Sequence, residues 1–184
     1  MTHSSKKQVK TPLLDTLDGE RARILLYQLI RDDPSLAPRA EAIARAHLES
    51  VQIDMVADAL SSEIEAIKIE EIWDSSGRQR DGPYIYPSER AYEMIEEIVE
   101  EYMHELRSYA QRGMAEAGRE YCKGIILGLW HIQTDSHADI RDELPDEITD
   151  FIETVMEEWE KIVSDPDERA LLRDWMEQKG ILYS

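Results

Sequence analysis

The stretch that decides the fold is residues 88–112, SERAYEMIEEIVEEYMHELRSYAQR. Its large apolar residues recur at alternating steps of three and four, the spacing that keeps one stripe of an α-helix against a neighbouring helix. We therefore expect a long helix capped by Ser88, running to about Arg112 and ended by Gly113. The stripe comprises Tyr92, Ile95, Val99, Tyr102, Leu106 and Tyr109.

The next segment, residues 115–132, is apolar on most sides and is expected to be the central buried helix. It contains Gly124 and Gly128, four residues apart and therefore on one helix face. Glycine costs a helix about 1 kcal/mol relative to alanine, so two at this spacing indicate close backbone approach of a neighbouring helix.

The other segments also show helical periodicity and helical end signals. Asp18, Asp33 and Asp165 are expected N-caps, with Glu168 as the acid of a capping box and Gly180 as a helix stop. Because no segment alternates apolar and polar residues for long enough to predict a strand, we expect an all-α fold of about six or seven helices. Its form would be a compact bundle or a short αα-superhelix. The remaining helical segments are 17–33, 32–50, 51–67, 144–163 and 164–180.

Between two predicted helices lies WDSSGRQRDGPYIYPS, residues 73–88. A connection this long is uncommon unless it is functional or ordered by its own contacts. We expect an ordered loop over residues 73–87, with its three aromatic side chains packed back on the helical body. Arg78 and Arg80 could grip a carboxylate or phosphate, or anchor the loop to glutamates of the long helix; we favour anchoring. The interaction candidates are Trp73, Arg78, Arg80, Tyr84 and Tyr86.

The length of 184 residues favours one all-α domain over residues 11–184, preceded by a disordered basic tail, residues 1–10. That tail has no apolar segment typical of a secretory signal, and the longest apolar run, residues 124–130, is far short of the ~20 residues that cross a bilayer. Cys122 is the single cysteine, which excludes an intrachain disulfide and a multi-cysteine zinc site and suits a packed structural thiol. We expect a cytoplasmic protein.

The chain is strongly acidic, with 40 Asp and Glu against 21 Lys and Arg. Residues 11–184 carry 18 basic against 40 acidic residues, a net charge of −22. This charge repels nucleic acid and anionic membranes and favours cations or basic proteins. Solubility or adaptation to a salty cytoplasm explains it more simply than one specific basic partner. We expect a protein partner or self-association, and neither nucleic acid nor membrane binding.

The familiar catalytic signatures for phosphate, dinucleotide, zinc-protease and serine-hydrolase chemistry are absent from the sequence. The acidic long helix, with Glu101 and His104 three residues apart, suggests a weak alternative. It would be a metal-dependent all-α enzyme, similar to a magnesium-dependent nucleotide pyrophosphatase or a carboxylate-bridged metal bundle. We favour solvated charges over this alternative and expect no cofactor and no catalytic residue. The alternative metal ligands are Glu93, Glu97, Glu101, His104, Glu147 and Asp150.

A second acidic segment, TDSHADIRDELPD, could chelate a metal through Asp135, His137 and Asp139. Only one imidazole is available there, and acidic loops between helices are common. We therefore interpret the segment as a connection that caps its flanking helices.

The sequence around the long loop, IEEIWDSSGRQRDGPYIYPSERAYEMIEE followed by CKGIILGLW, resembles a helical segment of uncharacterised prokaryotic proteins, some of which also carry a SWIM-type zinc finger. The resemblance covers about residues 13–159, and one cysteine cannot build the zinc finger. It implies a helical domain without an assigned activity. Its most specific positions are Trp73, Asp74, Gly77, Arg78, Tyr84, Pro87, Gly124 and Gly128.

Taken together, the sequence predicts an acidic helical domain that acts as a non-catalytic protein-interaction or scaffold module.

Overall fold

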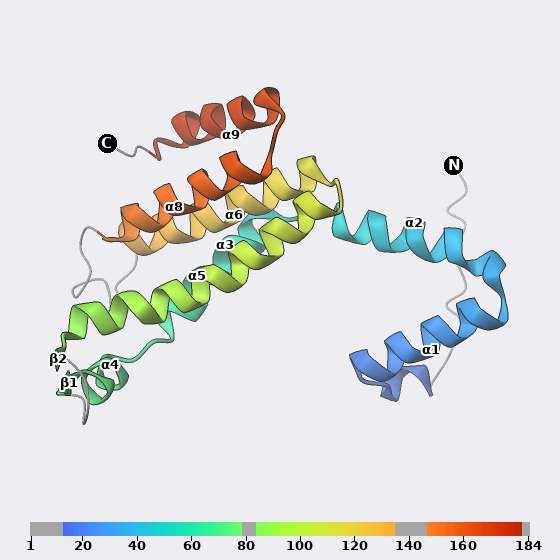
Figure 1. Cartoon of the computed structure of the whole chain (residues 1–184), viewed down its shortest axis with the longest axis horizontal. Coiled ribbons are helices and arrows are strands. Elements are labelled where there is room, and N and C mark those ends of the chain that lie inside the picture. Colours follow the sequence, from blue (N-terminus) through green and yellow to red (C-terminus); the bar gives the residue numbers. More distant parts are fainter. Residues whose placement is uncertain (1–12, 79–83, 135–146, 182–184) are drawn as a thin grey trace, which may run out of the picture. The chain divides into compact units, whose positions relative to one another are not determined.

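The computed structural model describes residues 13–78, 84–134 and 147–181, and these residues form an all-α fold, as the sequence predicts (Figure 1). They contain eight α-helices, slightly more than the six or seven expected. The elements are η1 (Leu14–Thr16), α1 (Gly19–Asp32), η2 (Pro34–Leu36), α2 (Ala37–Leu48), α3 (Ile53–Glu65), α4 (Ile69–Ser75), β1 (Gly77–Arg78), β2 (Tyr84–Ile85), α5 (Pro87–Gln111), α6 (Ala115–Thr134), α8 (Glu147–Ile162) and α9 (Pro166–Lys179).

Residue contacts divide the chain into two compact units, residues 1–47 and 48–184. We call them the N-terminal unit and the main unit. The boundary between residues 47 and 48 has no counterpart in the sequence analysis, which placed residues 11–184 in one domain.

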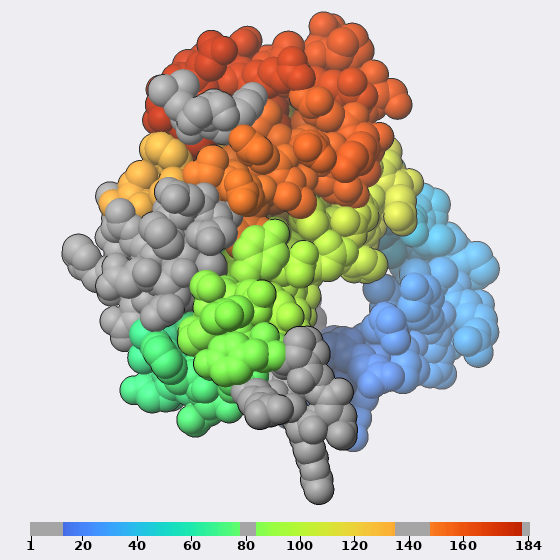
Figure 2. All heavy atoms as spheres, turned by 60° about the vertical axis from the view of Figure 1, so that its left-hand side comes forward, coloured from blue at the N-terminus to red at the C-terminus, as the bar shows by residue number. Residues whose placement is uncertain are grey.

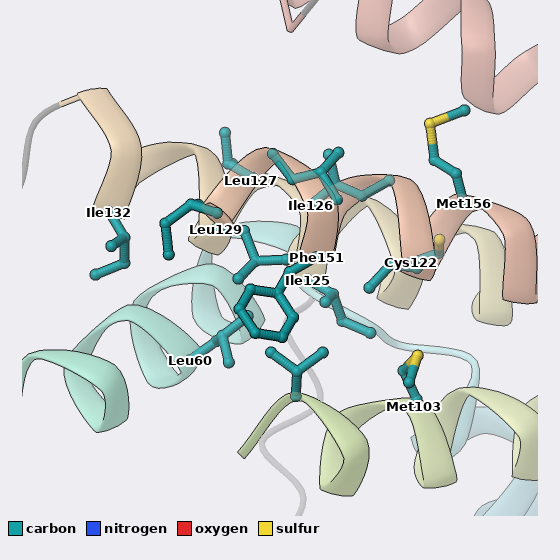
Figure 3. Packing of buried hydrophobic residues seen from close by; sticks show 14 of the residues in the cluster. Leu60, Met103, Cys122, Ile125, Ile126, Leu127, Leu129, Ile132, Phe151 and Met156 are labelled. Atoms are coloured by element: carbon teal, nitrogen blue, oxygen red, sulfur yellow. The ribbon is translucent and has the colours of Figure 1, made fainter. Parts of the chain in front are cut away.

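In the main unit, α6 is the central helix, as predicted. It packs most extensively on α3, then on α8 and on α5, and it also contacts α9. Four of its side chains, Ile125, Ile126, Leu129 and Ile132, are fully buried. Figure 3 shows them pointing toward α3, α5 and α8, where Leu60, Met103 and Phe151 meet them.

The two glycines of α6 lie where α3 comes closest. A Cβ added at Gly124 would lie 2.5 Å from the Val56 Cβ, and one at Gly128 would lie 2.8 Å from the Ala57 carbonyl oxygen. Real Cβ atoms do not approach so closely, so any side chain at these positions would push the two helices apart. The predicted close approach is confirmed.

The long helix α5 buries the predicted stripe: Ile95, Val99 and Leu106 are buried, and the Tyr92 ring stacks on Phe151 of α8 at 4.6 Å. The helix begins at Pro87, so the expected Ser88 cap is wrong. Proline supplies no N–H and has a helical φ, which makes it a natural first residue.

The helix ends follow the predicted signals with two differences. Asp18 caps α1 and Asp165 caps α9, each accepting a backbone N–H bond, and Gly180 ends α9 with a φ of +70°. Asp33 also caps, but the turn it starts is the single 3-10 turn η2, because the chain restarts as α2 at Ala37. Glu168, the expected capping-box acid, instead accepts a hydrogen bond from the Arg119 guanidinium of α6 at 2.6 Å.

The N-terminal unit has no buried residue in its described part, residues 13–47. α1 and α2 are amphipathic, yet eight large apolar side chains of the unit are 37–82% exposed. These residues are Leu13, Leu14, Ile24, Leu26, Tyr27, Leu29, Leu36 and Ile43.

Membrane crossing demands a long and uniformly apolar helix, and no helix in the described part of the chain meets both requirements. The cytoplasmic location stays a prediction.

Candidate functional site

The segment that connects α4 to α5 is held by three local contacts. Ile72 of α4 is fully buried in the core of the main unit. The Arg90 Nε–H of α5 donates to the Ser75 hydroxyl at 3.2 Å. The strands β1 and β2 pair antiparallel, with Gly77 opposite Ile85. We call residues 69–78 and 84–90 the α4–α5 corner.

Three aromatic side chains stand exposed on this corner, and we call them the aromatic surface: Trp73, Tyr84 and Tyr86. They are 58%, 55% and 59% exposed, so the prediction that they pack back on the helical body is wrong. The rings of Tyr84 and Tyr86 meet edge to face at 5.1 Å. In Figure 2 the corner faces the viewer and its green atoms lie at the surface.

Ile72 and Trp73 are neighbours on α4 with opposite burial. Consecutive residues of an α-helix point ~100° apart, and here Ile72 lies in the core while Trp73 lies at the surface. The tyrosines belong to a two-residue strand and the residue before α5, where only one side of the chain faces the core. The corner is held by Ile72 and the Arg90–Ser75 bond, and its three aromatic rings lie at the surface.

The α4 side of the aromatic surface is acidic, whereas Arg78 of β1 pairs with Tyr84 on the other side. Glu70, Glu71 and Asp74 are all exposed on α4, beside Trp73. Glu89 of α5 uses its carboxylate to accept the Tyr86 backbone N–H at 2.9 Å, which fixes the start of the helix. An exposed indole next to carboxylates attracts Lys or Arg side chains through cation–π and charge interactions.

The side chains of the two candidate arginines lie outside the described part of the structure. The backbone of Arg78 pairs with Tyr84 in the β ladder, while Arg80 lies outside the described residues. Whether these arginines anchor the loop or bind a ligand stays a prediction.

The alternative metal ligands do not come together in the described part of the chain, which holds no group of three or more His, Cys, Asp or Glu suited to a metal ion. Glu93, Glu97, Glu101 and His104 are exposed on α5, and Glu93 pairs with Arg90 at 2.9 Å. Exposure on one helix face explains them as solvated charges.

The other two candidate ligands belong to α8. Asp150 sits near Tyr92, whose pKa is raised by burial and by the negative charges of Glu96 and Asp150. Glu147 is the first residue of α8, and its side chain lies outside the described residues, as do Asp135, His137 and Asp139.

Cys122 is fully buried in α6, and burial raises the pKa of its thiol. A thiol that is neutral and inaccessible serves packing and not nucleophilic chemistry. This agrees with the structural role expected from the sequence.

A groove of about 460 Å³ lies where α3, α6 and α9 meet, and the sequence analysis did not find it. Of its charged lining residues, Glu120 accepts hydrogen bonds from Lys123 at 2.7 Å and from Arg119, which also donates to Glu168. No short motif signals this groove, because its residues come from three helices far apart in sequence. Its lining is Val51, Gln52, Ile53, Asp54, Glu120, Leu127, Trp175 and Lys179.

Comparison with known proteins returned no matching family model, no matching curated protein and no matching solved structure. The resemblance to a segment of SWIM-associated proteins therefore stays a prediction.

Proposed function

We propose that this chain is a non-catalytic protein-interaction module that binds its partner through the aromatic surface. The observation that carries the proposal is the exposure of Trp73, Tyr84 and Tyr86 together on one corner whose backbone is fixed. Tryptophan and tyrosine are enriched among the residues that dominate binding energy at protein interfaces. They lose little conformational entropy on binding because each has only two side-chain torsions.

The chemistry around the surface indicates a partner segment with basic and apolar side chains. The exposed carboxylates of Glu70, Glu71 and Asp74 would meet Lys or Arg, while the aromatic rings would meet aliphatic groups or the cation itself. The charge of the main unit supports the same class: residues 48–184 carry 34 acidic against 13 basic residues, a net charge of −21. Such a field speeds the approach of a basic partner and disfavours an acidic one.

The test is a quantitative comparison of proteins that co-purify from the native cell with wild type and with the double variant Trp73→Ala, Tyr86→Ala. We expect specific proteins to be retained by wild type and lost by the variant. The matched control is Met55→Ala on α3, which removes an equally exposed large side chain elsewhere in the main unit. Identical sets of proteins from all three chains would contradict the proposal.

Metal analysis of the purified protein distinguishes the competing hypothesis, a metal-dependent enzyme, from the interaction module. Stoichiometric iron, manganese or magnesium that is lost on Glu101→Ala would favour it over the interaction module.

A further inference from the structure

The groove where α3, α6 and α9 meet is formed entirely by residues of the main unit. Its volume of about 460 Å³ lies within the ~300–1,000 Å³ typical of sites for small molecules. At ~30 Å³ for each water molecule, this space holds roughly 15 non-hydrogen atoms. The groove is therefore large enough for an organic ligand bigger than a free amino acid such as leucine.

The groove has an apolar lining that the protein already covers in part. Leu127 of α6 is only 7% exposed. The other apolar lining residues are half-buried: Val51, Ile53 and Trp175. The Lys123 ammonium lies 5.8 Å from the centroid of the Trp175 ring and helps to hold that ring in place. Apolar groups of a ligand would therefore meet a preformed surface and lose their contact with water.

Two opposite charges of the lining lack a partner in the described part of the chain. Asp54 is the second residue of α3, Lys179 is the last residue of α9, and both are exposed. Neither forms an ion pair or a side-chain hydrogen bond with a described residue, whereas Glu120 is paired with Lys123 and Arg119. Because α6 contacts both α3 and α9, the two unpaired charges lie on different walls of the groove.

One ligand pairs with both walls if its ammonium and carboxylate groups lie at opposite ends. A free amino acid carries both groups on one carbon atom, whereas a dipeptide carries them on different residues. Gln52 makes no side-chain capping bond, so its amide can donate to and accept from the central peptide group of a dipeptide. That peptide group then avoids the cost of an unpaired polar group in a partly dry groove.

We propose that this groove binds a dipeptide with apolar side chains. Its ammonium pairs with Asp54, its carboxylate pairs with Lys179, and its side chains pack on Leu127 and Trp175. Such a ligand bridges α3 and α9, so its binding stabilises the folded main unit. This inference goes beyond the interaction module and does not rest on the aromatic surface.

Isothermal titration calorimetry of the full chain with leucyl-leucine tests the proposal. We expect one site per chain, and free leucine should bind at least about 10-fold more weakly because it cannot reach both charges. Leucyl-leucine should also raise the melting temperature. Two results overturn the proposal: millimolar leucyl-leucine that neither binds nor raises the melting temperature, or leucine that binds equally well.

The variants Asp54→Asn and Lys179→Met test the two charged contacts. Each should weaken leucyl-leucine binding about 5- to 10-fold, since both side chains remain partly in water. The matched controls are Asp58→Asn on α3 and Lys161→Met on α8, which remove exposed charges outside the groove lining. The controls should bind like wild type. Equal weakening by variants and controls would show a general effect of charge and would overturn the site.

Modified peptides test which end of the ligand meets which wall, and they need no change in the protein fold. Acetylation of the amino end removes the ammonium and should weaken binding to wild type, but it should have little further effect on Asp54→Asn. Amidation of the carboxyl end should behave in the same way with Lys179→Met. If acetylation weakens binding to wild type and Asp54→Asn by the same factor, Asp54 does not hold the ammonium and the proposed arrangement is wrong.

The double variant Trp73→Ala, Tyr86→Ala separates this site from the aromatic surface. It should bind leucyl-leucine like wild type even where it loses a protein partner. A loss of leucyl-leucine binding in this variant would place the dipeptide at the aromatic surface and overturn the groove as its site.

Discussion

The helices of both units have amphipathic sequences. The main unit buries the apolar faces of its helices, whereas the N-terminal unit leaves much of its apolar surface exposed. α5, α6 and α8 of the main unit bury their apolar stripes against one another, so Ile95, Ile126 and Val155 are inaccessible to water. α1 carries an equally clear stripe, yet Leu26 and Leu29 are half exposed. Apolar periodicity therefore shows that a helix has a face to bury, and it does not show which surface buries that face.

The largest expected difference between a buried and an exposed region is the difference in stability between two tryptophan substitutions. Trp159 of α8 is 1% exposed, and Trp73 on the aromatic surface is 58% exposed. We expect Trp159→Ala to lower the free energy of unfolding by ~3–5 kcal/mol, because it leaves a cavity among α5, α6 and α8. Trp73→Ala should cost less than ~1 kcal/mol.

Chemical denaturation followed by circular dichroism measures both changes without relying on tryptophan fluorescence. A loss of several kcal/mol in Trp73→Ala would show that this side chain stabilises the corner. That result would also remove the main support for the aromatic surface as a binding site.

A smaller difference in melting temperature is expected between alanine substitutions at two glycines. Gly128→Ala places a Cβ against the Ala57 carbonyl of α3, whereas Gly19→Ala at the start of α1 meets nothing within 4 Å. Overpacking a tight helix pair costs ~1–3 kcal/mol, so Gly128→Ala should lower the melting temperature despite alanine's better helix propensity. Gly19→Ala should leave it unchanged or slightly raise it.

Equal melting temperatures for wild type and Gly128→Ala would mean that α3 moves aside at little cost. The close approach of α3 and α6 would then be a consequence of the small residue and not a requirement of the fold.

The sequence predicted those features of the fold that depend on local chemistry. The stripe of α5, the paired glycines of α6 and the caps Asp18 and Asp165 each depend on the spacing or type of a few neighbouring residues. Features that depend on distant residues were missed. The local sequence predicts Glu168 as a capping acid, but its carboxylate accepts a hydrogen bond from Arg119 of another helix.

The candidate site shows the same limit. The sequence identified Trp73, Tyr84 and Tyr86 as interaction candidates, but it predicted them as buried. Large aromatic residues are usually covered, and the exposure of Trp73 beside a buried Ile72 is set by tertiary packing that the local sequence does not contain. The missing core of residues 13–47 could not be predicted, since each helix has a normal amphipathic pattern.

The smallest expected effect concerns the ion pairs that Glu120 makes with Lys123 and Arg119 within α6. Burial raises the pKa of Glu120, but the hydrogen bond and charge of Lys123, with those of Arg119, outweigh it and hold the pKa below its usual 4.5. A carboxylate with a lowered pKa in the folded state stabilises the fold above its unfolded-state pKa. That stabilisation is lost as pH falls through the folded-state value.

We therefore expect Glu120→Gln to lower the melting temperature at pH 7, with the difference from wild type shrinking below about pH 4.5. The control is Glu116→Gln, which neutralises an exposed glutamate one turn earlier in α6. Thermal unfolding at a series of pH values measures both. A difference that persists undiminished at low pH would mean that Glu120 acts through packing, because only a charge interaction disappears when the carboxylate of the wild type takes up its proton.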